Sequence, residues 1–363
     1  MALRLIIEKG IGKIIPVLSP GMHISEIAAK AGLPENSLLH FIRQLSTINI
    51  FREPKPRTFA HSTVSSILAN PAFSNMADLL LHFSDEGYKS SGYLTESLDL
   101  YADKFDQVQK PELRTAFNLA YNTDLHFFDY IYTPENIPRY GERFGRSMMG
   151  GARQERVTAT IEAYDWKQFK EGDTIIDVGG GIGHIGVWIS ELVKPGVKII
   201  IQDRPSVIEQ GKAIHGHIVD LQPHNFFEPQ PIKGATVYYL RLILHDWPDS
   251  ICKTILGHIV EAMSGESKLL IFDSVWAGDA YWACGKDDED MVTGWNQSKR
   301  HMNTRTVHMT TLLGILSPVL QLTVGAKERS EEEWHELLGS VGLKITNIHG
   351  RGLWQSVIEA VKA

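Results

Sequence analysis

The clearest local signal in the sequence is the segment Asp177-Val178-Gly179-Gly180-Gly181-Ile182-Gly183. It follows an apolar run typical of a strand and comes directly before a helical pattern. Glycines at such a turn let the chain bend tightly and let a ligand approach the backbone without a Cβ in the way. The helix behind the turn presents free N–H groups and a positive dipole end, which favour an anionic ligand group. The segment therefore predicts a ligand site where a strand passes into a helix.

Strand-like and helical patterns alternate around this segment. The strand-like runs cover residues 174–178, 198–202, 236–240 and 267–273, and the helical patterns between them cover 184–193, 206–214 and 250–263. This alternation predicts an α/β fold with a doubly wound, Rossmann-like parallel sheet. A helix at 330–341 and apolar runs at 344–348 and 355–360 are expected to add a reversed strand pair that closes the sheet.

The chain before about residue 165 has a different, mostly helical pattern. Helical spacing at 24–31 and 37–48 is followed at 50–60 by a tract typical of a small hairpin with a proline-bearing turn. Helix, helix and hairpin in this order predict a winged-helix-like unit. The chain has 363 residues, which is enough for two domains, and we place them at 1–165 and 166–363.

Two ligands compete for the glycine segment. The spacing Gly181-x-Gly183-x-x-Gly186 matches the dinucleotide fingerprint, and Asp203 lies about 20 residues further on, at the end of the next strand-like run. In the other interpretation Asp177 accepts a hydrogen bond from a ligand amine, as in S-adenosylmethionine, and Asp203 binds the ribose hydroxyls. A glycine turn that binds no cofactor is the third interpretation.

A second cluster lies at residues 241–249, directly after the strand-like run at 236–240. It places His245 between Arg241 and the pair Asp246-Trp247. The cluster belongs at the carboxyl end of the sheet, the edge where doubly wound folds bind ligands. Because a histidine titrates near neutral pH, His245 is a candidate general base.

Taken together, these features resemble the S-adenosylmethionine-dependent O-methyltransferases of the plant caffeic-acid type and their fungal relatives. The resemblance covers about residues 3–361, and the matching segments are 177–183, 201–208, 225–229, 244–249 and 325–330. The tract 116–124 makes the fungal branch of secondary metabolism look the most similar. The resemblance implies a class I methyltransferase domain behind the winged-helix-like one, S-adenosyl-L-methionine as cofactor, and a homodimer.

The resemblance also assigns residues to the two ends of the cofactor. Asp177, Gly179 and Gly181 would line its methionine end, and Asp203 would hold its ribose hydroxyls. These roles favour S-adenosylmethionine over a nicotinamide dinucleotide as the ligand of the glycine segment.

Four further positions match family residues around the cofactor. Asn225 and Phe226 stand where the family has an aspartate and an apolar residue that contact adenine, and Trp247 would pack near the same ring. Arg241 stands where plant members have a lysine that touches the cofactor. Asn225 therefore departs from the family pattern by the loss of one charge.

The catalytic positions of the family also have counterparts. His245 aligns with the general base that deprotonates the acceptor hydroxyl, and Asp273 and Glu328 fall where two glutamates flank that histidine. A phenol is a poor nucleophile at neutral pH until a base begins to remove its proton. A carboxylate beside the histidine would fix its tautomer and stabilise the imidazolium. Asp273 is one methylene shorter than the family residue, and no metal is expected.

The resemblance implies a small aromatic or polyketide-type secondary metabolite as the acceptor. Asn122 and Met148 align with substrate-pocket positions, whereas His126 is either a substrate contact or a polar helix residue. Some fungal relatives have lost methyl transfer and act instead as pericyclases, cyclases or dehydratases. The retained His245 favours methyl transfer, and this second activity stays as the alternative.

Composition argues against several other classes of protein. The net charge is −7, and the helix expected at 37–48 carries one base-reading cation, Arg43, so we expect no nucleic-acid partner. The two cysteines, Cys252 and Cys284, exclude a disulfide framework. With no membrane-length apolar run and no secretory signal, we expect a cytoplasmic enzyme. The family usually begins with helices that intertwine two subunits, whereas this sequence enters at the helix before the winged-helix-like unit, so we expect either an altered dimer or a shortened chain.

Overall fold

A computed structural model describes residues 2–71, 74–101, 115–154, 161–276, 328–351 and 355–363. Residues 325–327 of the last matching segment, and Cys284, lie outside these ranges. The chain divides into two compact units, one of Met1–Thr95 with Ala116–Gln154 and one of Glu96–Thr115 with Glu155–Ala363. Among the described residues, no helix combines the length and apolar character that crossing a bilayer requires.

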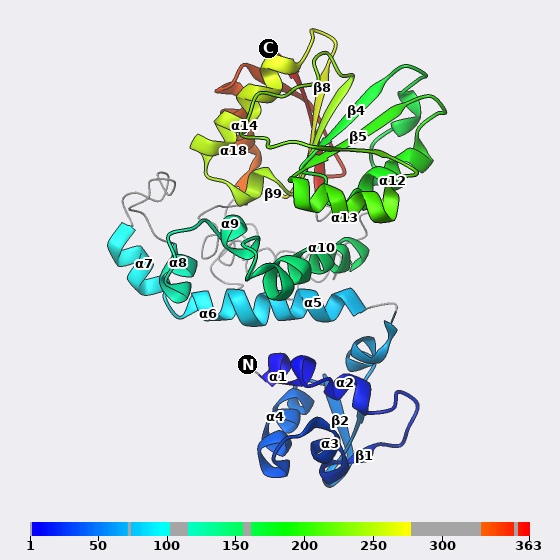
Figure 1. The fold of residues 1–363 in the computed structure, drawn as a ribbon, viewed down its shortest axis with the longest axis vertical. Coiled ribbons are helices and arrows are strands. Elements are labelled where there is room, and N and C mark those ends of the chain that lie inside the picture. The colour runs from blue at the N-terminus through cyan, green and yellow to red at the C-terminus, as the bar shows by residue number, and fades with distance from the viewer. Residues whose placement is uncertain (1, 72–73, 102–114, 155–160, 277–327, 352–354) are drawn as a thin grey trace, which may run out of the picture. The chain divides into compact units, whose positions relative to one another are not determined.

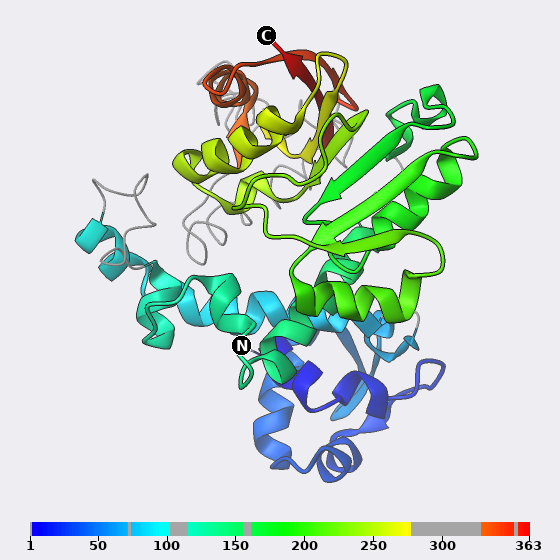
Figure 2. The ribbon, with the colours of Figure 1, turned by 45° about the horizontal axis from the view of Figure 1, so that its top comes forward.

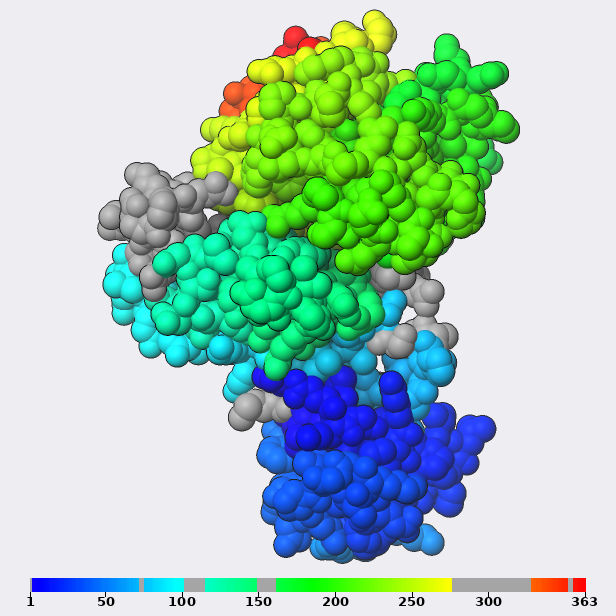
Figure 3. Space-filling view, viewed as in Figure 1, coloured from blue at the N-terminus to red at the C-terminus, as the bar shows by residue number. Residues whose placement is uncertain are grey.

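The first unit begins with the predicted order of two helices and a hairpin. Its elements are α1 (Ala2–Glu8), α2 (Ile11–Ile14), β1 (Met22–His23), α3 (Ile24–Ala31), α4 (Glu35–Thr47), β2 (Phe51–Lys55) and β3 (Thr58–His61). The three strands form a sheet of order β1-β3-β2. Ile27 and Ile42 are fully buried in the core that these elements share. In the space-filling view of Figure 3 these residues, in the darker blues, form one close-packed body.

The rest of the first unit is helical. It contains η1 (Ser65–Ala69), α5 (Ser74–His82), the π-helical turn η3 (Phe83–Gly87), α6 (Tyr88–Ser91), α8 (Ala116–Tyr121), α9 (Phe127–Ile131), the π-helical turn η5 (Ile137–Gly141) and α10 (Glu142–Gln154), while α7 (Leu94–Tyr101) crosses the unit boundary. The π-helical turn η3 thus stands between α5 and α6. There the buried Asp85 pairs with Arg4 at 2.7 Å, Arg139 at 3.0 Å and Arg143 at 2.9 Å. These ion pairs compensate the burial of a carboxylate.

The second unit is built on a seven-stranded sheet of order β11-β12-β8-β7-β4-β5-β6. Its strands are β4 (Thr174–Val178), β5 (Lys198–Asp203), β6 (Asp220–Pro223), β7 (Val237–Arg241), β8 (Lys268–Asp273), β11 (Leu343–His349) and β12 (Ser356–Lys362). The first five are parallel, and β12 runs antiparallel to both β8 and β11. The predicted doubly wound sheet and its closing strand pair are thus confirmed, with β12 as the reversed strand of that pair and β11 in the direction of the first five.

Helices cover both faces of this sheet. They are α12 (His184–Leu192), α13 (Pro205–His215), α14 (Asp249–Ala262) and α18 (Glu331–Gly339). The first two lie on one face and the last two on the other (Figure 1, Figure 2). Strands covered on both faces need continuous apolar side chains, and Ile175, Ile176 and Val178 of β4 are accordingly buried.

The two units divide about ten residues before the boundary that we predicted at residue 165. The reason is a small aromatic cluster at the start of the second unit. Tyr164 precedes the predicted boundary, and its ring lies 5.1 Å from that of Trp166 and 5.2 Å from that of His349 in β11, measured between centroids. Its hydroxyl donates to Glu359 Oε2 of β12 at 3.2 Å. The cluster ties the segment before β4 to the sheet. Most of the segment 96–115, which groups with the second unit, lies outside the described residues.

Candidate active site

The glycine segment forms a tight turn at the carboxyl end of β4. Gly179, Gly181 and Gly183 have φ values of 76°, 60° and 90°, in the region that favours glycine. The amides of Gly179 and Gly180 donate to the Gln202 carbonyl at 2.8 and 3.1 Å. A Cβ on Gly179 would lie 2.5 Å from Ile243 Cδ1. The turn is therefore fixed by the neighbouring strand and leaves no room for a side chain where a ligand approaches.

Asp203 anchors this turn from the end of β5. Its Oδ2 accepts from the Gly181 amide at 2.8 Å, and its Oδ1 accepts from the Arg204 amide at 2.7 Å. The sequence suggested a role for Asp203 toward a ribose, and the structure adds a role in shaping the glycine turn itself.

Polar groups gather behind the turn. Within the described part of the chain, Asp177 Oδ2 and both ring nitrogens of His184 are buried without a hydrogen-bond partner. Burial raises the pKa of Asp177 to about 7, against the lowering effect of Arg241. Burial, together with the charge of Arg241, lowers the pKa of His184 to about 4. A carboxylate and a guanidinium so placed fit the ammonium and carboxylate ends of an amino-acid group, such as the methionine end of S-adenosylmethionine.

An aromatic cluster stands near the same turn. The rings of Phe226 and Phe227 lie 6.0 and 5.0 Å from that of Trp247, which is buried. Phe226 lies close to Gly179, 3.7 Å from the position of a Cβ there. Asn225 is exposed, and its Oδ1 accepts from the Phe227 amide at 3.2 Å. The cluster offers flat apolar surface of the kind that a purine ring packs against.

His245 follows β7 through a strained residue. Leu242 has a φ of 52°, which is unfavourable for a residue with a side chain, and it turns the chain out of the sheet. His245 then lies in the short 3₁₀ turn η7 (Leu244–Asp246). Its Nδ1 lies 3.0 Å from Glu328 Oε1 and 3.6 Å from Asp273 Oδ1. The structure thus brings the three predicted catalytic residues together, and the shorter Asp273 side chain falls outside hydrogen-bond distance.

The carboxylates around His245 control its protonation. Burial alone would lower the pKa of His245, but the carboxylates of Asp273, Asp246 and Glu328 and the hydrogen bond to Glu328 raise it well above its usual range. Burial and the charge of Glu328 raise the pKa of Asp273, whose Oδ1 accepts from the Ser274 amide at 3.0 Å. The raised pKa favours the protonated form of His245, and its basic form accumulates as the pH rises.

The same three side chains have a spacing that a cation could use. Among the described residues, ligand atoms of His245, Asp273 and Glu328 lie within 4.8 Å of one another. The direct Nδ1–Oε1 contact of 3.0 Å is, however, the geometry of a proton held between histidine and carboxylate. The expectation that no metal takes part stays a prediction.

The three predicted substrate residues lie in the first unit. Asn122 has a φ of 48° and ends α8, and His126 is the N-cap of α9, where its Nδ1 accepts from the Phe128 amide at 3.4 Å. His126 therefore lies just before α9, where its ring nitrogen accepts from a free amide of the first turn. The expectation that it lies within a helix is wrong. Met148 is half-buried on α10. Their contact with a substrate stays a prediction.

Sequence reasoning missed one structural residue beside these. Asn118 on α8 donates through Nδ2 to the carbonyls of Thr123 and Leu125, at 3.0 and 2.8 Å, and so holds the loop between α8 and α9. Asn118 lies in the tract 116–124, whose resemblance to the family does not indicate this role. The pattern of a short polar residue near a helix end gives no signal that separates such a bond from a solvated side chain.

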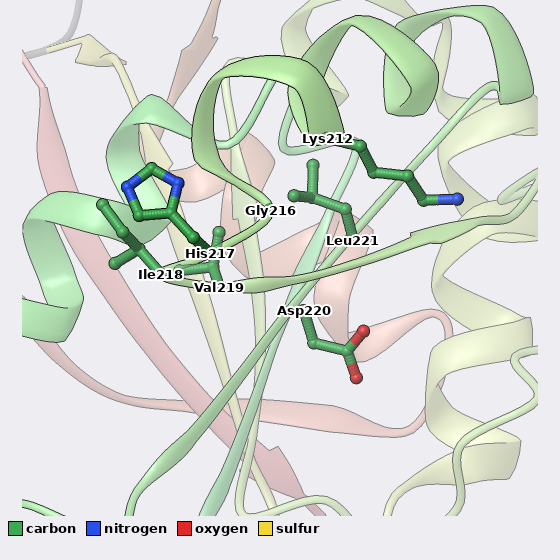
Figure 4. Close-up of a pocket in the computed structure, with 7 residues that line it drawn as sticks. All are labelled: Lys212, Gly216, His217, Ile218, Val219, Asp220 and Leu221. Atoms are coloured by element: carbon green, nitrogen blue, oxygen red, sulfur yellow. The ribbon is translucent and has the colours of Figure 1, made fainter.

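A separate open depression of about 570 Å³ lies where α13 joins β6 (Figure 4). It is lined by Lys212, Gly216, His217, Ile218, Val219, Asp220 and Leu221. Asp220 begins β6, whereas Asp203 ends the neighbouring β5, so the depression lies toward the opposite edge of the sheet. Its lining includes no residue of the glycine segment or of the His245 cluster, although Val219 and Leu221 lie near Gly183.

The doubly wound sheet with a reversed closing pair, the glycine turn between two carboxylates and the histidine after β7 define a class I methyltransferase. A family model described as an O-methyltransferase domain matches residues 101–344, and the chain belongs to that family. It is an S-adenosylmethionine-dependent enzyme.

Relatives of known name support the same family. The chain is 33% identical over 351 residues to the O-methyltransferase xanE of Aspergillus fumigatus. The alignment covers 94% of this chain and 72% of that protein. It is 31% identical over 354 residues to the O-methyltransferase penK of Penicillium thymicola, which covers 96% of this chain and 73% of that protein. The sequence-based assignment to a fungal branch of O-methyltransferases is thereby confirmed.

Solved structures share the fold at lower identity. OxaC in complex with S-adenosylhomocysteine and oxaline has a TM-score of 0.79 at 23% identity, covering 100% of this chain and 84% of that chain. A structure described as a pericyclic reaction enzyme has a TM-score of 0.75 at 23% identity, covering 100% of this chain and 86% of that chain. At this identity the likeness concerns the fold alone.

Proposed function

We propose that this enzyme methylates a hydroxyl group of a small aromatic or polyketide-type secondary metabolite, with His245 as the general base. The observation that carries the proposal is the buried contact of 3.0 Å between His245 Nδ1 and Glu328 Oε1. A carboxylate at Nδ1 leaves Nε2 to take a proton and stabilises the imidazolium that forms. In its neutral form, a histidine held in this way can accept a proton from a substrate at Nε2.

The roles of the residues follow from their positions. S-adenosylmethionine, when bound, supplies a methyl group already activated on a sulfonium. Asp177 and Arg241 would hold its amino-acid end, and Asp203 its ribose. Phe226 and Trp247, with Asn225 at the rim, would enclose its adenine. His245 removes the hydroxyl proton of the acceptor, and Glu328 and Asp273 keep the ring oriented and its charge balanced.

The acceptor class is tested by the requirement for a hydroxyl. The enzyme is incubated with S-adenosylmethionine and small phenols or polyketide-type hydroxyls, each beside its own methyl ether. We expect mass spectrometry to find methylated product from the hydroxyl compounds and none from the ethers. Equal turnover of an ether would place the methyl group on another atom and contradict the proposal.

A non-methylating activity is the second candidate, and a shared fold supports it. The pericyclic reaction enzyme shows that this fold carries reactions other than methyl transfer. The long distance of 3.6 Å between His245 and Asp273 departs from a symmetrical pair of flanking acids. The assembly into a homodimer and the cytoplasmic location stay predictions beside both candidates.

Removal of the Asp203 carboxylate is expected to weaken cofactor binding. Asp203→Ala leaves the Gly181 and Arg204 amides without their acceptor and removes the group proposed to bind the ribose. Because hydrogen bonds to a charged group contribute about 1.5–3 kcal/mol, we expect the Kd for S-adenosylhomocysteine to rise about tenfold or more. Isothermal titration calorimetry measures it. Asp220→Ala, which removes a surface partner of Lys198, is the matched control and leaves the Kd unchanged.

Cofactor affinity is also expected to depend on pH through Asp177. Burial raises the pKa of this carboxyl to about 7, so the anion that attracts an ammonium group forms only as the pH rises through neutrality. Between about pH 6 and pH 7.5 we expect affinity for S-adenosylhomocysteine to increase roughly eightfold, in step with the ionised fraction of Asp177. Asp177→Asn should bind more weakly at the higher pH and show a flat profile. An unchanged slope in that variant would assign the titration to another group.

A further inference from the structure

Arg329 is a fully buried arginine that directly follows Glu328. It lies in β10 (Arg329–Ser330), which pairs in parallel with β9 (Val275–Trp276), just beyond Asp273. A buried guanidinium is costly unless its donors find acceptors. The acceptors that bind these N–H groups therefore show what Arg329 does in the fold.

The guanidinium bridges both ends of the turn that carries His245. Nη1 donates to the Leu244 carbonyl at 2.8 Å, and Nη2 donates to the Trp247 carbonyl at 2.8 Å. These residues flank the pair His245-Asp246 on either side. The planar fork of an arginine can hold two carbonyls at a fixed separation, which a lysine ammonium cannot do.

Two further contacts fix the guanidinium itself. Nε and Nη2 donate to Asp249 Oδ1 at 2.9 and 2.7 Å, and the guanidinium carbon lies 5.3 Å from the centre of the Trp334 ring. Cys252 Sγ donates to the same two carbonyls, of Leu244 and Trp247, at 3.2 and 3.3 Å. The turn is thus held through its backbone carbonyls by the side chains of Arg329 and Cys252.

We propose that Arg329 is a positioning residue for the general base, an inference that rests on the proposed function. Glu328 orients the ring of His245 through Nδ1, and the next residue, Arg329, fixes the backbone on both sides of the histidine. Two consecutive residues, Glu328 and Arg329, therefore set both the direction and the place of the base. A displacement of about 1 Å at a reacting group can reduce a rate by about 10²-fold, so the effect of such a residue appears in kcat.

The test compares Arg329→Lys with a matched surface variant. Arg329→Lys keeps the charge and loses the bridge, and we expect a single-turnover rate about 10–10²-fold lower with the Kd for S-adenosylhomocysteine within about twofold. The rate should also reach its plateau at lower pH, because a loosened His245–Glu328 contact lowers the pKa of the histidine. The control is Arg351→Lys, which breaks the exposed Arg351–Glu331 pair and leaves rate, Kd and pH profile unchanged.

A double-mutant cycle separates positioning from general stabilisation. If Arg329 acts through the His245–Glu328 pair, Arg329→Lys should reduce the rate far less in a Glu328→Gln background than in the wild-type enzyme. The inference would be overturned if the rate losses of the two single variants multiply in the double variant and the pH profile of Arg329→Lys equals that of the wild type. An Arg329→Lys protein that is unfolded where Asp249→Asn, which keeps both carbonyl bonds, is folded would also overturn it. Failure of the proposed function is distinguished by His245→Ala, which would then keep the full rate.

Discussion

Replacement of His245 by alanine is expected to reduce the rate of methyl transfer by about 10²–10⁴-fold, the usual contribution of a positioned general base. The side chain lies at the carboxyl end of the sheet with Glu328 Oε1 at 3.0 Å, and the variant leaves the acceptor hydroxyl without a proton acceptor. The Kd for S-adenosylhomocysteine should change less than about threefold, because the glycine turn and Asp203 are untouched. Single-turnover kinetics and calorimetry measure the two quantities.

His217→Ala serves as the control for that variant. His217 is an exposed histidine at the depression between α13 and β6, and its removal should leave both rate and Kd unchanged. A His245→Ala enzyme with the wild-type rate would refute the assignment of the base. A large loss of cofactor affinity in this variant would instead place His245 in the cofactor site.

Glu328→Gln is the change with the second largest expected effect. It removes one of the negative charges and the hydrogen-bonded carboxylate that raise the pKa of His245. Because the neutral imidazole is the active form, the wild-type rate should rise with pH through this raised pKa. The variant should reach its plateau at lower pH, and the plateau should lie roughly 10²-fold below that of the wild type, since the imidazolium loses its partner.

The pH profile of the single-turnover rate is the measurement that checks this expectation. Glu331→Gln offers a matched control, because Glu331 is a glutamate of the same segment that pairs with Arg351 at the surface. Its profile should coincide with that of the wild type. A Glu328→Gln profile displaced toward higher pH would contradict the account, because the sign of the shift follows directly from the loss of a negative charge.

Most of the sheet could be predicted because its strands are buried on both faces. The run 174–178 coincides with β4, and the other predicted strands of the sheet agree with the structure to within two residues at either end. The missed strand is β6, Asp220–Pro223, in which only Leu221 is buried. An edge strand that contains a proline has neither the apolar run nor the alternation that marks a strand. Its position was fixed by pairing with β5.

The site was predictable to the extent that its residues sit in local motifs. Asp177 and the glycines are adjacent in sequence, and His245 follows a strand, so topology brings them to one edge of the sheet. Glu328 and Asp273 were placed beside His245 by resemblance, since neither is near it in sequence. The role of Arg329 could not be predicted, because its acceptors at Leu244 and Trp247 lie more than 80 residues earlier. Spacing carries no signal over such a separation.

The central claim is methyl transfer to a hydroxyl with His245 as base, and the amount of S-adenosylhomocysteine formed in a single turnover tests it most directly. The wild-type enzyme, loaded with S-adenosylmethionine and an accepted hydroxyl compound, should form S-adenosylhomocysteine and methylated product in equal molar amounts. His245→Ala should bind the cofactor and form neither at a comparable rate. An acceptor converted to an isomer or a dehydrated product, with no S-adenosylhomocysteine formed, would contradict the claim and identify a non-methylating enzyme.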